Sequence, residues 1–266
     1  EKEHATLLAI ELGFLPLALA HAAGYIKNNR ACTFEKYLDF FKGIGLDLYK
    51  PEYMRFSSHE KTILTTWKVS FDAISKKNST SITLANFLSV LATAPIPRTA
   101  IRKWFKTFVG PSELKFDAAL GYLQDYSLVD SSATLCHIHT LVQQAIRFHL
   151  PEGDREKHLK EALGVFCSLA EELDIEVSEN REALAFFVPH IDAICSALEG
   201  KSLPSEEGPS IRFLLDKLWE FYQHEGKYKE ALVYAKRGKQ VTEKQYEAQS
   251  VEVAVSLNAA SDTLGA

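Results

Sequence analysis

The chain has 266 residues, of which 46% are hydrophobic, and its formal net charge at pH 7 is -5. A chain of this length and composition can bury one or more hydrophobic cores, so it is globular. The small excess of acidic residues excludes a general electrostatic attraction to nucleic acid or to an anionic membrane.

The cysteines and the apolar segments bear on where the protein resides. Its four cysteines lie far apart without a CxxC pair, a pattern typical of a reducing compartment. No stretch predicts a transmembrane helix, and residues 1–30 lack the pattern of a signal peptide. We therefore expect a cytoplasmic protein without a membrane partner. The chain begins at Glu1 and its single methionine is Met54, so we also expect a piece of a longer protein.

The first part of the chain predicts a small helical unit, which we place over residues 1–56. Residues 1–12 are helix-like up to Gly13, which suits a helix C-cap, and Pro16 suits the first turn of the next helix. Thr33 can cap a third helix, whose apolar residues recur at helical spacing. They are Phe34, Tyr37, Leu38 and Phe41.

Residues 57–150 predict helices followed by a β-hairpin. The apolar stripes of the helices are Leu64, Trp67, Phe71 and Ile74; Leu84, Phe87, Leu88 and Leu91; Ile101, Trp104, Phe105 and Phe108; and Phe116, Ala119, Leu120 and Leu123. Pro95 to Pro97 separate the second helix from the third. Tyr126 to Asp130 and Thr134 to Ile138 alternate like two strands, Ser131-Ser132 supplies the turn, and a further helix opens at Thr140. This arrangement predicts a winged-helix domain.

Beyond Pro151 the pattern is wholly helical. Residues 151–200 predict a linking pair of helices, and Pro189 is expected to bend or interrupt the second of them. In residues 201–266, Leu215 to Tyr222 is echoed by Leu257 to Leu264, and Gly226 lies between helical segments. Such helix pairs are typical of an α-solenoid of the tetratricopeptide type, here truncated within its second repeat. The predicted fold class is therefore mainly all-α.

Three segments in this order resemble one known family. They are LGFLPLALAHAAGYI at Leu12–Ile26, TTWKVSFDAI at Thr65–Ile74 and HIHTLVQQAIR at His137–Arg147. Together they are similar to the C-terminal half of an NB-ARC module, and most similar to the fungal NLR-like members of the STAND signalling NTPases. These proteins join the module to tetratricopeptide repeats, and the GKYKEAL segment resembles a turn of such a repeat.

The resemblance implies two site residues and a set of partners. Pro16, in Gly13-Phe14-Leu15-Pro16-Leu17, matches the proline that packs against the adenine ring. His139 matches the histidine of the methionine-histidine-aspartate motif, which senses the ADP phosphates, although Ile138 and Thr140 differ from the flanking residues of that motif. The implied partners are a missing N-terminal nucleotide-binding domain, a protein or peptide bound by the repeats, and further copies of the receptor after activation.

No GxxxxGK[ST] loop occurs in the sequence. Such a loop supplies backbone amides, a lysine and a magnesium-binding hydroxyl to the phosphates of ATP. We therefore expect this chain to have no enzyme activity and no cofactor of its own, whereas the intact parent would bind ADP or ATP with magnesium. The chain would then be the regulatory and scaffolding part of a nucleotide-dependent switch.

Alternatives remain at each site and for the function. Pro16 could simply start a helix, and His139 could be a capping or surface residue. Cys136, His137 and His139 make a poor metal site, because consecutive strand residues point to opposite faces and no fourth ligand is apparent.

Two other functions compete with the switch. A winged helix can bind nucleic acid, for which Arg98, Arg102, Lys103 and Lys106 supply a basic patch. We do not expect that partner, because four charges on a net acidic chain give weak, salt-dependent binding. A peptide-binding scaffold would explain residues 211–266 but leaves the first 150 residues unexplained.

Overall fold

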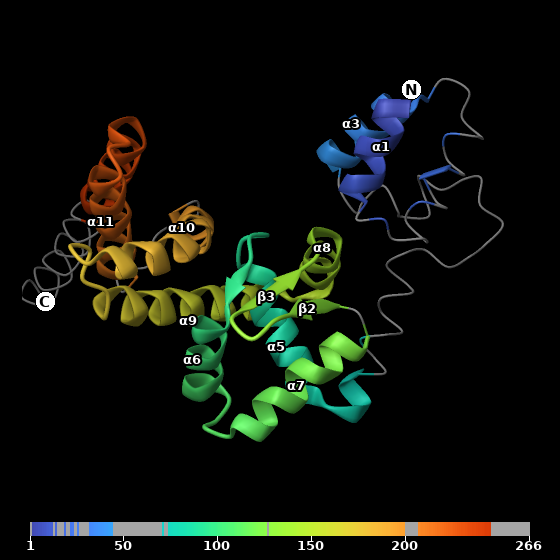
Figure 1. Ribbon diagram of the computed structural model, residues 1–266, viewed down its shortest axis with the longest axis horizontal. Helices are drawn as coiled ribbons and strands as arrows, with labels where there is room; N and C mark the ends of the chain where they lie inside the picture. The colour runs from blue at the N-terminus through green and yellow to red at the C-terminus, as the bar shows by residue number, and fades with distance from the viewer. Residues whose placement is uncertain are drawn as a thin grey trace, which may run out of the picture. The chain divides into compact units, whose positions relative to one another are not determined.

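The structure is a computed structural model that describes residues 2–12, 14, 19, 22–23, 26, 32–44, 71, 74–126, 128–199 and 207–245. It is mostly helical with a small three-stranded sheet (Figure 1), which confirms the predicted fold class. The helices are α1 (Lys2–Glu11), α3 (Phe34–Ile44), α5 (Ser79–Val90), α6 (Arg98–Phe108), α7 (Glu113–Asp125), α8 (Thr140–His149), α9 (Glu152–Glu171), α10 (Ser178–Glu199) and α11 (Gly208–His224). Residues 228–245 are also helical.

The chain separates into two compact units, each described by itself below. The first contains Glu1–Ser89, Ser112–Ser132 and His137–Glu152. The second contains Val90–Pro111, Ala133–Cys136 and Gly153–Ala266.

The sheet has the strand order β1-β3-β2. Strand β1 (Ile96–Pro97) runs antiparallel to β3 (Leu135–Ile138), with Ile96 opposite Cys136, and β2 is Val129–Ser131. The sequence predicted two strands and only a break between helices at Pro95 to Pro97, so β1 at Ile96–Pro97 is a third strand that was not predicted. Because β1 is an edge strand, Pro97 is tolerated there despite its missing N–H.

The strands of the hairpin are shorter than predicted. Tyr126 belongs to the end of α7, where its N–H donates to the Tyr122 carbonyl, and the Leu128 N–H donates to the Leu123 carbonyl. These bonds keep the chain in a helix-end turn, so β2 begins only at Val129. Residues 132–134, rather than Ser131-Ser132, connect β2 to β3.

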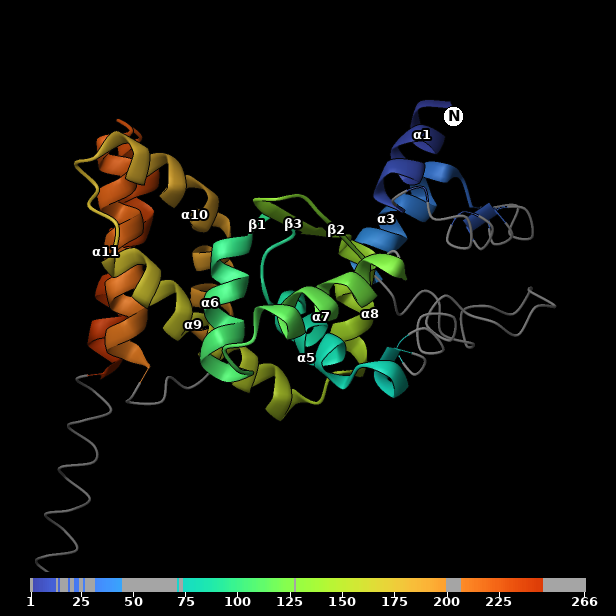
Figure 2. The ribbon, with the colours of Figure 1, turned by 60° about the horizontal axis from the view of Figure 1, so that its bottom comes forward.

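In the first unit, α1 and α3 pack against α8. The buried residues of this cluster are Leu8, Leu12, Ala22, Cys32, Tyr37, Leu38, Phe41, Leu141 and Ala145. Thr33 caps α3 as predicted, because the Lys36 N–H donates to its hydroxyl oxygen at 3.2 Å. Helices α5 and α7 lie beside one another in this unit (Figures 1 and 2).

The predicted stripes of α5 and α7 are confirmed. Their buried residues include Leu84, Phe87, Leu88, Leu91, Phe116, Ala119, Leu120 and Leu123. The preceding stripe is confirmed at Ile74, which is fully buried, whereas Leu64 and Trp67 lie outside the described residues.

In the second unit, α6 buries Ile101, Trp104 and Phe105, as the sequence predicts. Phe108, predicted as the fourth member of the stripe, is 47% exposed because it is the last residue of the helix. The Trp104 indole N–H donates to the Glu161 carboxylate on α9 at 2.9 Å, and the His158 Nδ1 lies 2.8 Å from the same oxygen. This buried polar cluster joins α6 to α9.

Helix α10 runs through Pro189 without the predicted interruption. His190, the next residue, is fully buried, and its Nε2 lies 3.1 Å from the Pro95 carbonyl oxygen. Its ring lies against Phe166 of α9, with ring centroids 5.9 Å apart. His190 therefore contacts both α9 and the residue before β1.

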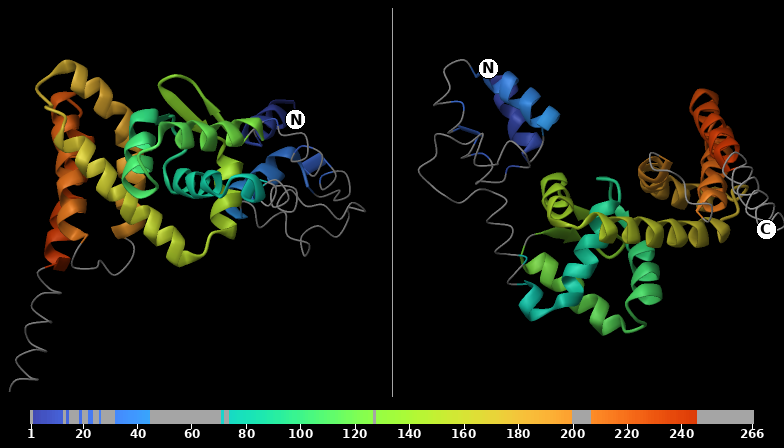
Figure 3. Two further views of the ribbon diagram at one scale, coloured as in Figure 1. Left: turned by 90° about the horizontal axis from the view of Figure 1, so that it is seen from below. Right: turned by 180° about the vertical axis from the view of Figure 1, so that it is seen from behind.

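Helix α11 and the helix over residues 228–245 run side by side (Figure 3). Gly226 lies in the turn between them with a φ of 70°, a conformation that L side chains rarely adopt. The Lys227 N–H donates to the Tyr222 carbonyl at 2.9 Å, and the rings of Tyr222 and Tyr234 stack with centroids 5.4 Å apart. The predicted helix pair with a turn glycine is confirmed here, whereas its echo at Leu257 to Leu264 lies outside the described residues.

All four cysteines are free thiols, and Cys32, Cys136 and Cys195 are buried. Burial raises the pKa of Cys167 to about 11, and burial likewise raises the pKa of Cys195 and of Cys32.

Candidate functional site

His139 lies at the junction of β3 and α8, where it is the N-cap residue of the helix. Its backbone is extended, with φ -65° and ψ 140°, and its Nδ1 accepts a hydrogen bond from the Leu141 N–H at 3.2 Å. The capping role considered from the sequence is therefore present. Because Nδ1 is the acceptor, a neutral ring carries its proton on Nε2, which is left as a donor.

Helix α8 is held in the first unit by apolar and polar contacts. Leu141 and Ala145 belong to the cluster with α1 and α3. The Gln143 Nε2 donates to the Leu88 carbonyl at 3.1 Å, and the Arg147 Nε donates to the Ser89 carbonyl. These carbonyls lie in the last turn of α5, where a helix leaves acceptors without intrahelical partners. The start of α8, and with it His139, is therefore fixed from two sides.

A pocket of about 400 Å³ opens beside His139. Its lining residues come from the end of α7, from β2 and the residue before it, and from β3 with the residue after it. They are Gln124, Leu128, Val129, Asp130, His137 and His139. The pocket is formed wholly within the first unit.

The environment of His139 lowers the pKa of its imidazole. Partial burial is the largest cause, since it disfavours the charged ring, and the nearby His137 acts in the same direction. Glu11 of α1 opposes them by favouring the charged form. His139 is therefore neutral at pH 7 and presents an N–H donor rather than a positive charge.

The other predicted site residue, Pro16, lies outside the described residues. Of the residues considered for a metal, Cys136 is buried while His137 is exposed, so they point to opposite sides of β3. Within the described residues, no group of three or more histidine, cysteine or carboxylate side chains could hold a metal ion.

Sequence reasoning missed three polar residues of the pocket, namely Gln124, Asp130 and His137. The signal for His137 was present, because residues i and i+2 of a strand point to the same face. Gln124 and Asp130 carried no comparable signal, since their approach depends on how α7 and β2 lie around β3.

The basic patch considered for nucleic acid is partly committed to other contacts. The Lys103 ammonium lies 2.5 Å from the Glu172 carboxylate, and Arg98 is half-buried. Arg102 and Lys106 remain exposed on α6. The ion pair removes one charge from the patch, which favours a structural role for this face of α6.

The second unit contains a different candidate surface, on the helix pair near the end of the described chain. Tyr228, Leu232 and Val233 are more than half exposed, and Trp219 of α11 is 38% exposed. Tyr228 and Leu232 are four residues apart and therefore share one helix face. Exposed aromatic and aliphatic residues of this kind are typical of surfaces that bind other proteins.

The helix over residues 228–245 is tied to α10 by Arg237. Its guanidinium nitrogens lie 2.9 Å from Glu199 Oε1 and 2.5 Å from Asp192 Oδ1, and one of them donates to the Ser196 hydroxyl at 3.0 Å. These carboxylates raise the pKa of Arg237 against the opposing effect of its burial. The charge is thus satisfied by two carboxylates about two helical turns apart on α10.

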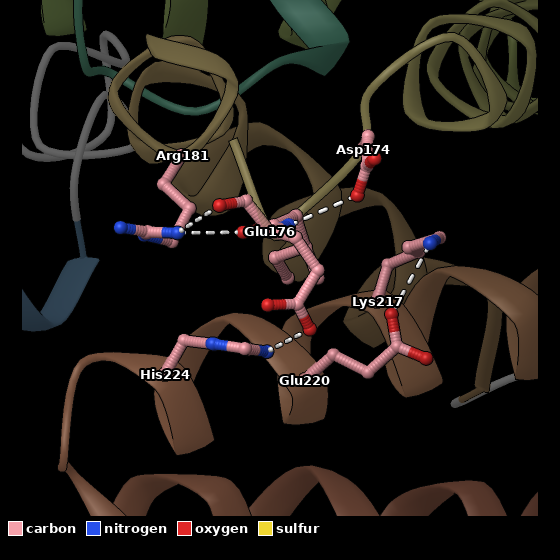
Figure 4. Close-up of polar contacts among 7 residues, drawn as sticks. Asp174, Glu176, Arg181, Lys217, Glu220 and His224 are labelled. Carbon is pink, nitrogen blue, oxygen red and sulfur yellow. Dashed lines mark hydrogen bonds and ion pairs between the residues drawn. The ribbon is translucent and has the colours of Figure 1, made fainter. Parts of the chain in front are cut away.

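The loop between α9 and α10 is ordered by a second set of polar contacts, which reaches α11 (Figure 4). Arg181 Nη1 donates to the carbonyls of Ile175 and Glu176 at 2.8 and 3.1 Å. The Glu176 N–H donates to Asp174 Oδ1 at 3.0 Å, and its carboxylate lies 3.4 Å from His224 Nε2 on α11. The helix pair over residues 207–245 is therefore fastened to α10 and to the loop before it.

No helix among the described residues is both long enough and apolar enough to cross a membrane.

Comparison with known proteins finds a curated relative. The chain is 28% identical over 251 residues to a nucleotide-binding leucine-rich repeat (NLR)-like protein of Hyaloscypha variabilis, and the match covers 86% of this chain. The chain spans 23% of the length of that relative. No family model matches.

Among solved structures, the chain is similar to a Signal Transduction ATPase with Numerous Domains (STAND) protein with a tetratricopeptide repeat sensor from Pyrococcus horikoshii. The two are 15% identical with a TM-score of 0.30, over 84% of this chain and 41% of the other. The chain is thus similar in sequence, along most of its length, to part of an NLR-like protein.

Proposed function

We propose that this chain is the regulatory and scaffolding part of a cytoplasmic STAND receptor, controlling a switch between ADP-bound and ATP-bound states. In this proposal residues 57–150 form a winged-helix domain that closes over a nucleotide-binding domain upstream. The chain itself hydrolyses no ATP. The similarity to an NLR-like protein supports this reading, and the placement of His139 is the observation that carries it.

The residues around His139 fit a phosphate group in one respect and oppose it in another. A neutral imidazole with its proton on Nε2 can donate to a phosphate oxygen. The Asp130 carboxylate lines the same pocket and repels an anion. His139 would therefore hold the phosphate by a directed hydrogen bond from Nε2, and the negative charge would come from the phosphates of the nucleotide.

The size of the effect follows from that bond. A hydrogen bond to a charged group contributes about 1.5 to 3 kcal/mol. Its loss changes the ratio of closed to open receptor by about ten- to hundredfold. That change is enough to release a balanced switch into spontaneous self-association.

Two substitutions at one position separate sensing from capping. In the intact receptor, His139→Ala removes both the ring and the cap, whereas His139→Asn keeps a good N-cap acceptor and removes Nε2. We expect both variants to lose ADP and to elute as larger species in size-exclusion chromatography. If His139→Asn retains ADP and elutes with the wild type, His139 is only a cap and the sensing role is wrong.

The helix pair at residues 207–245 supports the second half of the proposal. The exposed residues Tyr228, Leu232 and Val233 supply an apolar surface for a protein or peptide ligand. Binding there shifts the switch only if the ligand has different affinities for the closed and open states. Arg237 forms ion pairs with α10, and His224 forms one with Glu176 in the loop before α10. A ligand that displaces this helix pair therefore also displaces α10 and that loop.

A further inference from the structure

The helix over residues 228–245 has one buried side and one exposed side. Ala231, Gly238 and Val241 are buried and recur at helical spacing, so they mark the side that packs on the rest of the unit. We call the opposite, exposed side the outer face. Its residues are Tyr228, Lys229, Leu232, Val233, Lys236, Lys239, Gln240, Glu243 and Lys244.

The outer face is apolar at one end and basic at the other. Tyr228, Leu232 and Val233 lie in the first turns of the helix, and they are 66%, 53% and 53% exposed. Three lysines follow at about 6 to 18 Å beyond Leu232 along the helix axis. They are Lys236, Lys239 and Lys244. The two kinds of surface are therefore neighbours on a single helix.

The basic end keeps most of its charge. Glu243 is the single carboxylate of the outer face, and it pairs with Lys239 at 3.6 Å. Both side chains of this pair are more than half exposed, so the attraction is weak. Lys236 and Lys244 form no ion pair with another of the described residues. The whole chain has a net charge of -5, so this end of the helix is a local concentration of positive charge.

We propose that the outer face binds an acidic protein segment, in which a few apolar side chains lie beside a group of carboxylates. The inference rests on the proposed function, because it takes this helix pair to be the ligand-binding surface, and it adds the charge of the ligand. Apolar side chains of the ligand cover Tyr228, Leu232 and Val233, while its carboxylates lie over the lysines. The lysines thereby select an acidic partner and speed its association.

Other anionic partners fit this face less well. An anionic membrane binds helices that insert a broad apolar face between the lipids. Here Lys229 interrupts an apolar area of only three side chains, and the other side of the helix is buried in the protein. Nucleic acid would engage the lysines through its phosphates, but Leu232 and Val233 would then lose their exposed area to no apolar partner.

The test measures the binding of two labelled helical peptides to this chain by fluorescence anisotropy. Both peptides have the same apolar half, and the other half carries glutamates in one peptide and lysines in the other. We expect the acidic peptide to bind at least about tenfold more tightly than the basic one. Added NaCl should reduce this preference, because salt screens exposed charges. Vesicles containing phosphatidylserine should not sediment the chain.

Substitutions on the outer face locate the site. The charge reversal Lys236→Glu/Lys239→Glu should weaken the acidic peptide by about five- to tenfold and strengthen the basic peptide. A loss of folding cannot produce that exchange of preference. Leu232→Ser should weaken both peptides, since it removes an apolar contact that they share.

Matched controls make the same changes elsewhere on the surface. Lys106→Glu/Lys115→Glu gives the same change of net charge at exposed positions of α6 and α7, and Leu114→Ser removes a leucine of α7 that is 83% exposed. These variants should bind both peptides as the wild type does.

Three results would overturn the inference, and they differ in what they leave standing. Equal affinity for both peptides, reduced by Leu232→Ser, leaves the helix pair as a ligand surface without a preference for acid. If neither peptide binds, or if the controls weaken binding as much as the substitutions on the outer face, the ligand-binding half of the proposed function is wrong as well, while the role of His139 is unaffected. Sedimentation with the vesicles in place of peptide binding would assign the outer face to a membrane.

Discussion

Replacing His190 with glutamine should remove part of the acid sensitivity of this protein. His190 is fully buried on α10, and its Nε2 lies 3.1 Å from the Pro95 carbonyl oxygen. If Nε2 is the donor, Nδ1 is an unprotonated acceptor, and within the described residues it is buried without a hydrogen-bond partner. A second proton on this ring would place an uncompensated charge in the core.

Burial lowers the pKa of His190 to about 4, against the favourable effect of the Pro95 carbonyl. In the unfolded chain its pKa is about 6.5, so between these values the unfolded state binds more protons than the folded state. Above pH 6.5 the ring is neutral in both states, so His190 does not lower the free energy of unfolding. As the pH falls from 6.5 toward 4, the unfolded chain takes up a proton that the folded chain does not, and the free energy of unfolding falls. At about 1.4 kcal/mol per pH unit, the loss amounts to roughly 3 kcal/mol.

His190→Gln keeps a donor for the Pro95 carbonyl, because the amide nitrogen of glutamine reaches as far as Nε2 of histidine. We expect it to cost about 1 to 2 kcal/mol at pH 7 through poorer packing against Phe166. Between pH 6.5 and 4.5 its urea midpoint should fall less than that of the wild type. His149→Gln, which removes an exposed histidine, should follow the wild type at every pH.

The assay is urea unfolding followed by tryptophan fluorescence at several pH values between 4.5 and 7.5. Carboxylates elsewhere also titrate in this range, so the informative quantity is the difference between the variant and the wild type. Parallel curves for the two proteins would refute the reasoning, because they would show that His190 does not titrate differently in the folded state.

Arg237→Leu should lower the stability of the helix over residues 228–245 by about 2 kcal/mol, since it leaves Glu199 and Asp192 without their shared cation. Arg237→Lys should recover only part of that stability. Limited proteolysis would show the loss as earlier cleavage in this helix. Gly226→Ala should destabilise by about 1 kcal/mol in urea unfolding, because the φ of 70° disfavours a side chain although space is open. Gly164→Ala, inside α9 and also without a neighbour within 4 Å, should instead stabilise by about 0.5 to 1 kcal/mol, so equal effects at the two positions would contradict the backbone argument.

The apolar periodicity was sufficient to predict most of the helices, because each must bury one face. It predicted the helix that opens at Thr140, which is α8 and which buries Leu141 and Ala145. It could not show that Leu141 and Ala145 pack with Leu8 and Tyr37, which are more than a hundred residues earlier in the chain. That pairing depends on tertiary packing, which no local pattern records.

Strand β1 illustrates a second limit. Ile96 and Pro97 are too few to show alternation, and two nearby prolines favour a helix boundary there. The strand forms because Ile96 pairs with Cys136 on the neighbouring strand β3. The contact of Trp104 with Glu161, across 57 residues, is of the same kind. The nucleotide-sensing role of His139 stays a prediction from the resemblance, whereas its role as a cap is seen in the hydrogen bond from the Leu141 N–H.

The burial of the native thiols has a practical consequence for labelling. Maleimide reagents react with the thiolate, and a thiol whose pKa is raised to about 11, as for Cys167, forms almost none at pH 7. Cys32 and Cys195 share both burial and a raised pKa. A cysteine introduced at an exposed position beside that surface, such as Lys229→Cys, should therefore take up a fluorophore selectively while the four native cysteines stay in place. The dye would then report ligand binding at the helix pair without a cysteine-free background having to be built first.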